Sequence, residues 1–310
     1  MANSSGLNRT GVLSRITVAA ITAALVGTTT AAVAAETPAA SAKAVGTTQA
    51  APRATAFGAT AGAAAAAVTP VNALYGVNNA GDIYGYGLTG NGGLTASEKT
   101  GYGFQYKKFV TQTDVDNNGE SNGVWFVQNN RLYYGPWSQD GRDLGGGWGI
   151  YNRVFSPANA GGGSADDLLA RDNAGVLWLY LGYNNGGIAQ RVRVGAGWDA
   201  YSQITGKGDL TGDGKADIVA RDGSGVLWLY KGTGNYKAPY SGRTRIGSGW
   251  NTFNSLLSIG DMNNDGIADL MARDSAGALW LYKGTGNAPA PFHTKVKIGT
   301  SGWNGFRLMF

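Results

Sequence analysis

The tetrapeptide Leu-Trp-Leu-Tyr occurs three times in this chain, beginning at Leu177, Leu227 and Leu279. The intervals between these copies are 50 and 52 residues. Two weaker copies begin upstream at Ile83 and Leu132, and they continue the series at intervals of 49 and 45 residues. A repeat of this length is typical of a unit that cannot bury its apolar surface alone and must pack against its neighbours. The chain is therefore expected to fold as a repeat protein of five units.

Each unit shows the pattern of four short strands separated by turn residues. In the fifth unit an apolar strand precedes an acidic loop, and a hairpin with its turn at 274–277 follows. A Gly-rich turn and a fourth strand come next. The second to fifth units end on a Gly-Trp-x-x-aromatic motif such as Trp250 with Phe253, whereas the first has only the degenerate sequence Gly-Tyr-Gly-Phe-Gln-Tyr over 101–106. Four strands in about 45–50 residues are typical of a propeller blade. The predicted fold class of residues 71–310 is all-β, a β-propeller of about five four-stranded blades.

The two ends of the repeat region complement each other. The first unit begins at Ala73 in the register of a second strand, whereas 306–310 aligns with the strand that opens every other unit. An open arc of blades would leave an unpaired edge at each end, which favours association with other chains. We therefore expect 306–310 to pair beside 74–77 and to close the ring of a monomer.

The N-terminal part of the chain differs from the repeats. Arg9 and Arg15 flank the start of an apolar stretch over 16–34, which is the pattern of a secretory signal peptide. Residues 36–70 are mostly Ala, Thr, Ser and Gly, and we expect a flexible linker there because few of these side chains can form a core. We predict a signal peptide over 1–35, a secreted, extracellular protein, and a mature chain without a membrane span.

Composition narrows the possible functions. Removing Arg9 and Arg15 from the 25 basic residues leaves 23 against 20 acidic ones, and a net charge of about +3 is too small for a nucleic-acid footprint. The chain has no cysteine, and His293 is its only histidine. Ser-His and Cys-His pairs and histidine-based zinc sites are therefore excluded. We find no catalytic constellation, and we expect a protein that is not an enzyme and that has no nucleic-acid partner.

The acidic loop of the fifth unit has the spacing of a cation site. Oxygen-bearing side chains stand at alternate positions, and Gly266 follows the third of them. Ca²⁺ takes about six to eight oxygens from carboxylates, amides and backbone carbonyls, and a glycine lets the backbone turn sharply between ligands. The expected ligands are the side chains of Asp261, Asn263, Asp265 and Asp269 and the backbone carbonyl of Ile267.

Two other units repeat this spacing with changes. The expected ligands are Asp209, Thr211, Asp213, Asp217 and the carbonyl of Lys215 in the fourth unit, and Asp114, Asp116, Asn118, Asn122 and the carbonyl of Glu120 in the second. The third unit has only Asn159, Gly161 and Gly163 before Asp167, and the first has no such loop. An EF-hand is excluded because no loop has the bidentate Glu at position 12. The alternative to a calcium loop is an Asx-rich turn without a metal.

These loops, set in a four-stranded unit, resemble the FG-GAP or VCBS-type repeats of bacterial secreted proteins, which are related in blade design to the integrin α-chain propeller. The resemblance covers 71–310 and rests on the motif Asp-x-Asp/Asn-x-Asp/Asn-Gly-x-x-Asp/Asn in the second, fourth and fifth units. It implies calcium loops between the first and second strands of a blade. It implies no fixed activity, because the fold carries adhesion, lectin and enzyme-accessory roles alike.

Aromatic residues beside polar, Gly-rich loops are the candidates for ligand binding. A flat ring offers an apolar face to a sugar, while neighbouring polar groups fix its orientation. The candidate ligand residues, all expected in variable loops, are Trp137, Tyr183, Tyr236 and Tyr240. A second set, repeated at one place around the ring, is expected to form either stacking platforms or core: Tyr133, Trp178, Trp228 and Trp280.

The leading hypothesis for function is a secreted, calcium-stabilised, non-catalytic propeller that binds a glycan or another cell-surface ligand. One alternative is an accessory or remnant module of a secreted hydrolase. The other is a protein–protein adhesion module.

Overall fold

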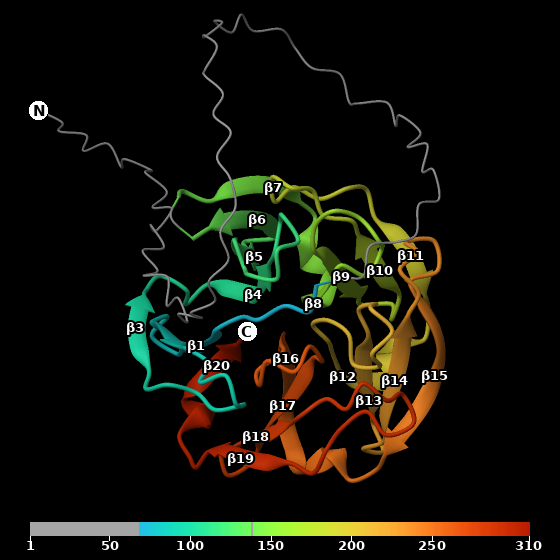
Figure 1. The fold of residues 1–310 in the computed structure, drawn as a ribbon. Helices are drawn as coiled ribbons and strands as arrows, with labels where there is room; N and C mark the ends of the chain where they lie inside the picture. Colours follow the sequence, from blue (N-terminus) through green and yellow to red (C-terminus); the bar gives the residue numbers. More distant parts are fainter. Residues whose placement is uncertain (1–67, 138) are drawn as a thin grey trace, which may run out of the picture.

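The structure is a computed structural model that describes residues 68–137 and 139–310. In these ranges the chain forms five antiparallel sheets of four strands each, arranged as blades around a central axis (Figure 1). The predicted all-β propeller of five four-stranded blades is confirmed. No helix among the described residues is long and apolar enough to cross a membrane. The predicted signal peptide and almost all of the predicted linker lie outside the described residues.

Each blade places its first strand at the axis and its fourth strand at the rim of the disc. From the axis outward, the first blade contains β20 (Phe306–Met309), β1 (Leu74–Asn78), β2 (Ile83–Tyr86) and β3 (Glu98–Gly101). The second contains β4 (Lys107–Thr113), β5 (Gly123–Gln128), β6 (Arg131–Pro136) and β7 (Arg142–Gly146). The third contains β8 (Tyr151–Ala158), β9 (Asp167–Asp172), β10 (Leu177–Tyr180) and β11 (Val192–Gly195). The fourth contains β12 (Tyr201–Thr205), β13 (Ile218–Asp222), β14 (Leu227–Gly232) and β15 (Tyr240–Gly247). The fifth contains β16 (Phe253–Gly260), β17 (Asp269–Asp274), β18 (Leu279–Tyr282) and β19 (Val296–Gly299).

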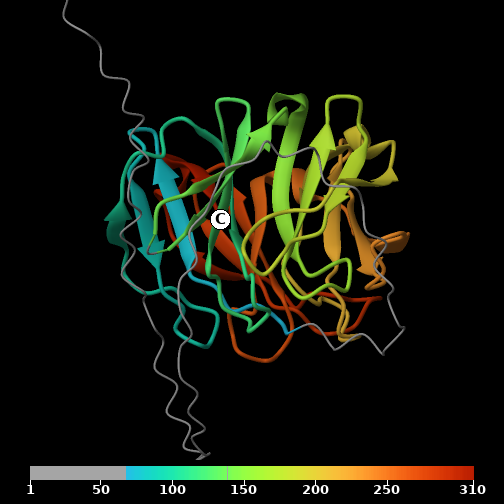
Figure 2. The same ribbon diagram turned by 90° about the horizontal axis from the view of Figure 1, so that it is seen from above.

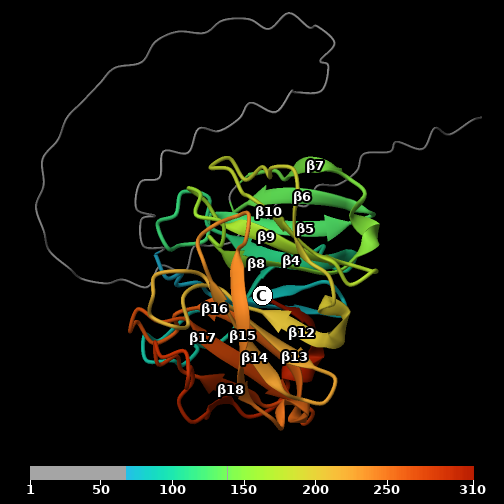
Figure 3. The ribbon, with the colours of Figure 1, turned by 90° about the vertical axis from the view of Figure 1, so that its right-hand side faces the viewer.

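The strands run between two faces of the disc, which Figures 2 and 3 show edge on. In blades two to five, the connections between the first and second strands and between the third and fourth strands lie on one face, which we call the loop face. The hairpin turns between the second and third strands and the links to the next blade lie on the opposite face, which we call the turn face. The predicted calcium loops therefore all lie on the loop face.

The repeated Leu-Trp-Leu-Tyr strands supply the core between blades. In β10, Leu177 and Leu179 are fully buried, whereas Trp178 and Tyr180 are half-buried. This alternation follows from the two-residue period of a strand, which sends successive side chains to opposite faces. Five clusters of buried side chains each join two neighbouring blades, and one of them joins the fifth blade to the first. The apolar core is thus continuous around the ring.

The Gly-Trp-x-x-aromatic motif forms the corner between blades. Four single-turn 3-10 helices carry it: η1 (Trp148–Ile150), η2 (Trp198–Ala200), η3 (Trp250–Thr252) and η4 (Trp303–Gly305). Gly249 precedes Trp250 at φ 87°, a backbone conformation that side chains with a Cβ rarely adopt. Arg221, from the repeated Ala-Arg-Asp sequence, donates from Nη1 to the carbonyl oxygen of Trp250 at 2.9 Å. The repeated arginine therefore ties the hairpins of the third, fourth and fifth blades to the following corner.

The last strand closes the ring as predicted. β20 pairs antiparallel with β1, with Gly76 opposite Met309 and Val77 opposite Leu308. The backbone N–H of Tyr75 donates to the carbonyl oxygen of Phe310 at 2.8 Å, and the N–H of Phe310 donates back at 3.0 Å. The first blade is therefore built from both ends of the repeat region.

Residues 68–72 cross the loop face at the centre of the ring (Figure 1). Thr69 Oγ1 donates to the Gly266 carbonyl oxygen at 2.7 Å, and the N–H of Val71 donates to the Gly119 carbonyl oxygen at 2.8 Å. The carbonyl of Pro70 lies so close to Gly260 that a Cβ on that glycine would be 1.8 Å from its oxygen. Within the predicted linker, Thr69 and Pro70 thus contact the fifth blade, and Val68 lies beside Gly119 of the second, where a Cβ would be 2.9 Å from Val68 Cγ1.

Candidate functional site

The fifth-unit loop is organised around the carboxylate of Asp261. Its Oδ1 accepts hydrogen bonds from the N–H groups of Asn263 (3.0 Å) and Asp265 (3.3 Å), and its Oδ2 accepts one from Gly266 (2.7 Å). Asn264 and Gly266 have φ of 60° and 85°, and this left-handed backbone turns the loop back on itself. The spacing read from the sequence therefore wraps the chain around its first residue.

One acceptor in this loop has no partner within the described structure. Asn263 Oδ1 is buried and makes no hydrogen bond, while the Nδ2 of the same side chain donates to Asp265 Oδ2 at 2.7 Å. A buried oxygen without a donor costs about 1–3 kcal/mol, so such atoms call for a partner. Carboxylate, amide and carbonyl oxygens are the ligands of Ca²⁺, and the donor set of this loop fits that ion.

The ninth loop residue, Asp269, bridges two loops of its own blade. Its Oδ2 accepts from the N–H of Met262 at 2.9 Å and its Oδ1 accepts from the N–H of Gly284 at 2.7 Å. Burial raises the pKa of Asp269 to about 7, and the nearby carboxylates of Asp261 and Asp265 add to the shift. Each carboxylate oxygen can accept a second partner, so these bonds are compatible with metal binding but do not require it.

The fourth-unit loop has the same frame with fewer free oxygens. Asp209 accepts from the N–H groups of Thr211 (2.8 Å), Gly212 (2.7 Å) and Gly214 (2.6 Å). The carboxylate of Asp213 forms an ion pair with Lys231 at 3.3 Å, so a cation bound there would compete with an ammonium group. The carboxylate of Asp217 accepts hydrogen bonds from the N–H groups of Leu210 and Gly232, the same pattern as in Asp269. Burial raises the pKa of Asp217 to about 7.

The second-unit loop is the most amide-rich of the three. Asp114 accepts from the N–H groups of Asp116 (3.1 Å) and Gly119 (2.7 Å), and burial raises its pKa to about 6. Asn122 Oδ1 accepts from the N–H of Val115 at 2.6 Å, and Asn118 Oδ1 accepts from the N–H of Glu120 at 2.8 Å. Most of the oxygens proposed as ligands thus already accept a backbone hydrogen bond.

The three loops share a geometry that is common to calcium loops and Asx-rich turns. Among residues 68–137 and 139–310, no three His, Cys, Asp or Glu side chains cluster closely enough to hold a metal by themselves. Any metal would depend on amide and backbone oxygens as well, as the spacing predicted.

The third unit, in which the metal pattern fails, contains an ion pair that sequence reasoning missed. Lys207, from the fourth blade, pairs with Asp166, and both side chains are 3% exposed. Lys207 Nζ also donates to the Gln112 carbonyl oxygen and to Ser156 Oγ, each at 3.0 Å. Asp166 occupies the position that is alanine in the fourth and fifth units, directly before the last acidic residue of the loop. This acidic residue in place of alanine was the sequence signal that could have indicated the ion pair.

The predicted ligand residues separate into two exposed and two packed side chains. Tyr183 and Tyr236 lie on the loop face and are 44% and 37% exposed. Trp137 packs on Tyr75 with ring centroids 5.2 Å apart and donates from Nε1 to the Ser121 carbonyl oxygen at 2.7 Å. Tyr240 is partly buried in β15, and its hydroxyl is buried without a partner in the described structure. Trp137 thus lies in the β6–β7 loop as expected but is packed against the first blade, whereas Tyr240 lies in a strand and not in a loop.

The repeated tryptophans of the hairpins are held between blades and capped by cations. Trp178 packs against the core shared by the second and third blades, and its Nε1 donates to Asp172 Oδ2 at 2.8 Å. The guanidinium of Arg191 lies over its ring at 4.0 Å. Trp228 and Trp280 repeat this arrangement, with Arg243 and with Lys295 and Lys297, respectively. Tyr133 instead stacks on Phe126 at 5.1 Å between centroids. These side chains were expected to form either stacking platforms for a ligand or part of the core, and these contacts favour the core.

Two further exposed aromatics lie on the turn face. Tyr102 and Tyr106 are 69% and 70% exposed, in the link between β3 and β4. In this link Phe104, which is 1% exposed, is the buried aromatic residue. In the sequence, the first unit departs from the Gly-Trp-x-x-aromatic motif at this link, and that departure could have indicated that these tyrosines are exposed.

Comparisons with known proteins support the repeat assignment. Residues 209–272, which span the fourth-unit loop and the start of the fifth blade, match the family model of an FG-GAP-like repeat. No curated protein sequence matches the chain significantly.

Several solved structures are similar at low identity. Human WBSCR16 is 9% identical, with a TM-score of 0.33, over 70% of this chain and 62% of that one. Prp20p from Saccharomyces cerevisiae is 10% identical, with a TM-score of 0.36, over 74% and 61%. AofleA from Arthrobotrys oligospora is 10% identical, with a TM-score of 0.42, over 76% and 73%. This chain thus spans less than two thirds of the first two proteins, and similarities of this size carry no functional argument.

Proposed function

We propose that this five-bladed propeller, which carries an FG-GAP-like repeat, is a secreted, non-catalytic binding module whose loop face is stabilised by Ca²⁺. The observation that carries the metal proposal is the partnerless, buried Oδ1 of Asn263 beside the carboxylates of Asp261 and Asp265. A divalent cation would give this oxygen a partner and would reduce the repulsion between the carboxylates.

Three loops would hold the ions, with different affinities. In the fifth unit the ligands would be Asp261, Asn263, Asp265, Asp269 and the carbonyl of Ile267. The fourth-unit loop would bind more weakly, because Lys231 already neutralises Asp213 and Thr211 replaces an acid. The second-unit loop would also bind more weakly, because two of its ligand side chains are neutral amides. Bound Ca²⁺ would supply charge compensation and cross-linking of each loop.

Calcium is expected to raise the melting temperature of the mature protein by several degrees. With a dissociation constant of about 0.1–1 mM, which is typical of extracellular sites, a tenfold excess stabilises the fold by about 1.4 kcal/mol per site. EDTA should reverse the shift. Asp265→Ala should remove more of it than Asn118→Ala, because the fifth site has the fuller ligand set. Differential scanning calorimetry across calcium concentrations would measure both effects.

The third unit supplies the matched control. Asn159 Oδ1 accepts from the N–H groups of Gly162 (2.9 Å) and Gly163 (3.0 Å), so it forms the same kind of turn without a predicted ion. Asn159→Ala should lower stability equally with and without calcium. Melting curves of the parent protein that do not respond to calcium would show that all these loops are Asx turns only.

The ligand surface we propose is the loop face around Tyr183 and Tyr236. Both tyrosines are exposed, and Tyr236 lies against the third-unit loop, where a Cβ on Gly161 would be 3.1 Å from the Tyr236 Cβ. Lys237 Nζ lies 5.8 Å from the Tyr236 ring and adds a hydrogen-bond donor to this surface. Exposed rings next to donors can stack on a sugar and hold its hydroxyl groups, so we propose a glycan ligand.

A glycan array probed with the mature protein is expected to show weak, multivalent binding without product formation. Binding should fall several-fold in Tyr236→Ala, because the stacking face is lost. Tyr106→Ala removes an exposed ring from the turn face and should leave binding unchanged. Equal losses in both variants, or no binding to any glycan, would contradict this assignment. Release of products from a polysaccharide panel would contradict the non-catalytic proposal.

A further inference from the structure

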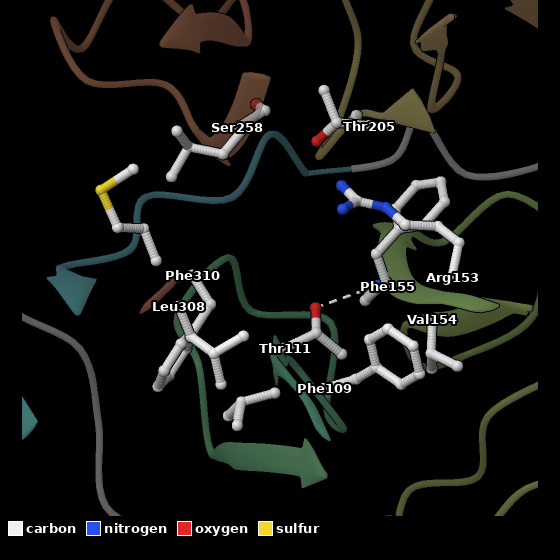
Figure 4. Close-up of a pocket in the computed structure, with 14 residues that line it drawn as sticks. Phe109, Thr111, Arg153, Val154, Phe155, Thr205, Ser258, Leu308 and Phe310 are labelled. Atoms are coloured by element: carbon white, nitrogen blue, oxygen red, sulfur yellow. Dashed lines mark hydrogen bonds between the residues drawn. The ribbon is translucent and has the colours of Figure 1, made fainter. Parts of the chain in front are cut away.

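The axis of the propeller contains a cavity of about 90 Å³. The innermost strands of all five blades line it, with Phe109–Thr111, Arg153–Ser156, Thr205, Leu257 and Phe310 among its wall residues. Figure 4 shows the side chains arranged around the channel. A single water molecule needs only about 10–15 Å³ of cavity volume measured in the same way, so this cavity has room for a small ligand.

One wall residue carries a charge that no neighbour neutralises. Arg153 Nε donates to the Ile204 carbonyl oxygen at 3.0 Å, and the guanidinium lies 5.6 Å from the Phe155 ring. No carboxylate among the described residues forms an ion pair with Arg153. Burial lowers its pKa to about 10, and the positive charge of Arg171 contributes to the shift. The side chain of Arg153 is half-buried, and a guanidinium that is partly withdrawn from water without a counter-ion favours an anion at this place.

The chemistry around the guanidinium is suited to a particular class of anion. Figure 4 shows Arg153 directed into the channel, with the hydroxyl-bearing side chain of Thr205 on the same side. The rest of the wall is mostly apolar, including Leu257, Leu308 and Phe310. A guanidinium binds a carboxylate through two parallel hydrogen bonds, and apolar walls favour a short hydrocarbon body.

Lys207, a further buried cation near the axis, does not compete for this anion. Lys207 already forms the ion pair with Asp166 and donates to Gln112 and Ser156. Residues 68–72 cross the loop face at the centre of the ring and are held there by their bonds to Gly119 and Gly266. A ligand would therefore enter from the turn face.

We propose that the channel binds a small monocarboxylate, with its carboxylate on Arg153 and Thr205 and its hydrocarbon part against Leu257, Leu308 and Phe310. This site is separate from the loop face and does not depend on calcium or glycan binding. It uses the side chains of different blades, so it exists only in the closed ring.

The proposal is tested by titrating the full mature protein with propionate and measuring binding by ligand-observed NMR. The parent should bind propionate saturably, and Arg153→Met should weaken binding at least tenfold, because the variant keeps an unbranched side chain but loses the charge and the fork. Arg245→Met, at an exposed arginine of β15, should bind as the parent does. Thr205→Val, which keeps the shape of the side chain and removes the hydroxyl, should weaken binding several-fold.

Each outcome decides the proposal. Saturable binding that is lost in Arg153→Met and kept in Arg245→Met supports it. Equal binding by the parent and Arg153→Met, or no saturable binding by the parent, overturns the site. Inorganic phosphate binding more tightly than propionate overturns the assignment to monocarboxylates. If Arg153→Met does not fold, Arg153→Lys replaces it, and parent-like affinity in that variant would overturn the bidentate contact.

Discussion

A chain that ends at residue 305 is expected to lose cooperative folding or to form oligomers. Removal of 306–310 deletes β20 and leaves β1 as an edge with unpaired N–H and C=O groups. It also removes the Phe310 ring, which packs on Tyr75 with centroids 5.6 Å apart. Arg307, which donates to the carbonyl oxygens of Phe104 and Lys107, is lost as well, so the first and second blades lose a link.

Thermal unfolding and size-exclusion chromatography measure this effect. A five-residue Gly/Ser tail added after Phe310 is the control, because it changes the end of the chain without removing a strand. The tailed protein should melt as the parent does and remain a monomer. A truncated chain with the melting temperature of the parent would contradict the role of β20 in closing the ring.

Lys207→Met is expected to destabilise the protein by about 3–5 kcal/mol, which is the usual cost of leaving one partner of a buried ion pair alone. The variant leaves the Asp166 carboxylate buried with only Ser156 Oγ (3.3 Å) and the N–H of Asp114 (2.9 Å) as donors. It also removes the contacts that join the second, third and fourth blades at the channel. Chemical denaturation monitored by tryptophan fluorescence would measure the loss.

The double variant Lys207→Met/Asp166→Leu distinguishes the contribution of the ion pair from the cost of leaving one buried charge unpaired. It should recover much of the lost stability, because no uncompensated charge remains in the core. Arg131→Met is the matched surface control: Arg131 pairs with Asp143 at 2.5 Å, but the two side chains are 47% and 40% exposed. This control should cost no more than about 1 kcal/mol. A Lys207→Met variant as stable as the control would mean that the buried pair contributes nothing.

The fold could be predicted because its information is local and repeated. The three Leu-Trp-Leu-Tyr strings, the hairpin turns and the four Gly-Trp corners each indicate a local structure of a few residues, and their repetition reinforces the prediction. Ring closure followed from the register of Ala73 and 306–310. The small and apolar residues before Val71 gave no sign in the sequence that Thr69 and Pro70 contact Gly266 and Gly260.

The acidic loops could be located but not fully interpreted from their spacing. The spacing of Asp261 and its equivalents predicts a cation-binding loop, and in the structure the backbone N–H groups of each loop donate to the carboxylate of its first residue. Whether a ligand oxygen is left free depends on how each side chain is turned. Only the tertiary structure distinguishes the partnerless Asn263 Oδ1 from Asp213, which Lys231 engages.

The amino-acid sequence by itself determined the strand order and the number of blades. It also determined which side chains of each strand face the core, and where the acidic loops lie. These features depend on residue periodicity and turn chemistry within about 50 residues of chain. The tertiary structure alone decided which aromatic rings are exposed, that Lys207 meets Asp166, and that Arg153 lines the channel without an ion pair to any described carboxylate. These contacts join blades that lie far apart in the chain, and their energies depend on burial, which exists only once the ring has closed.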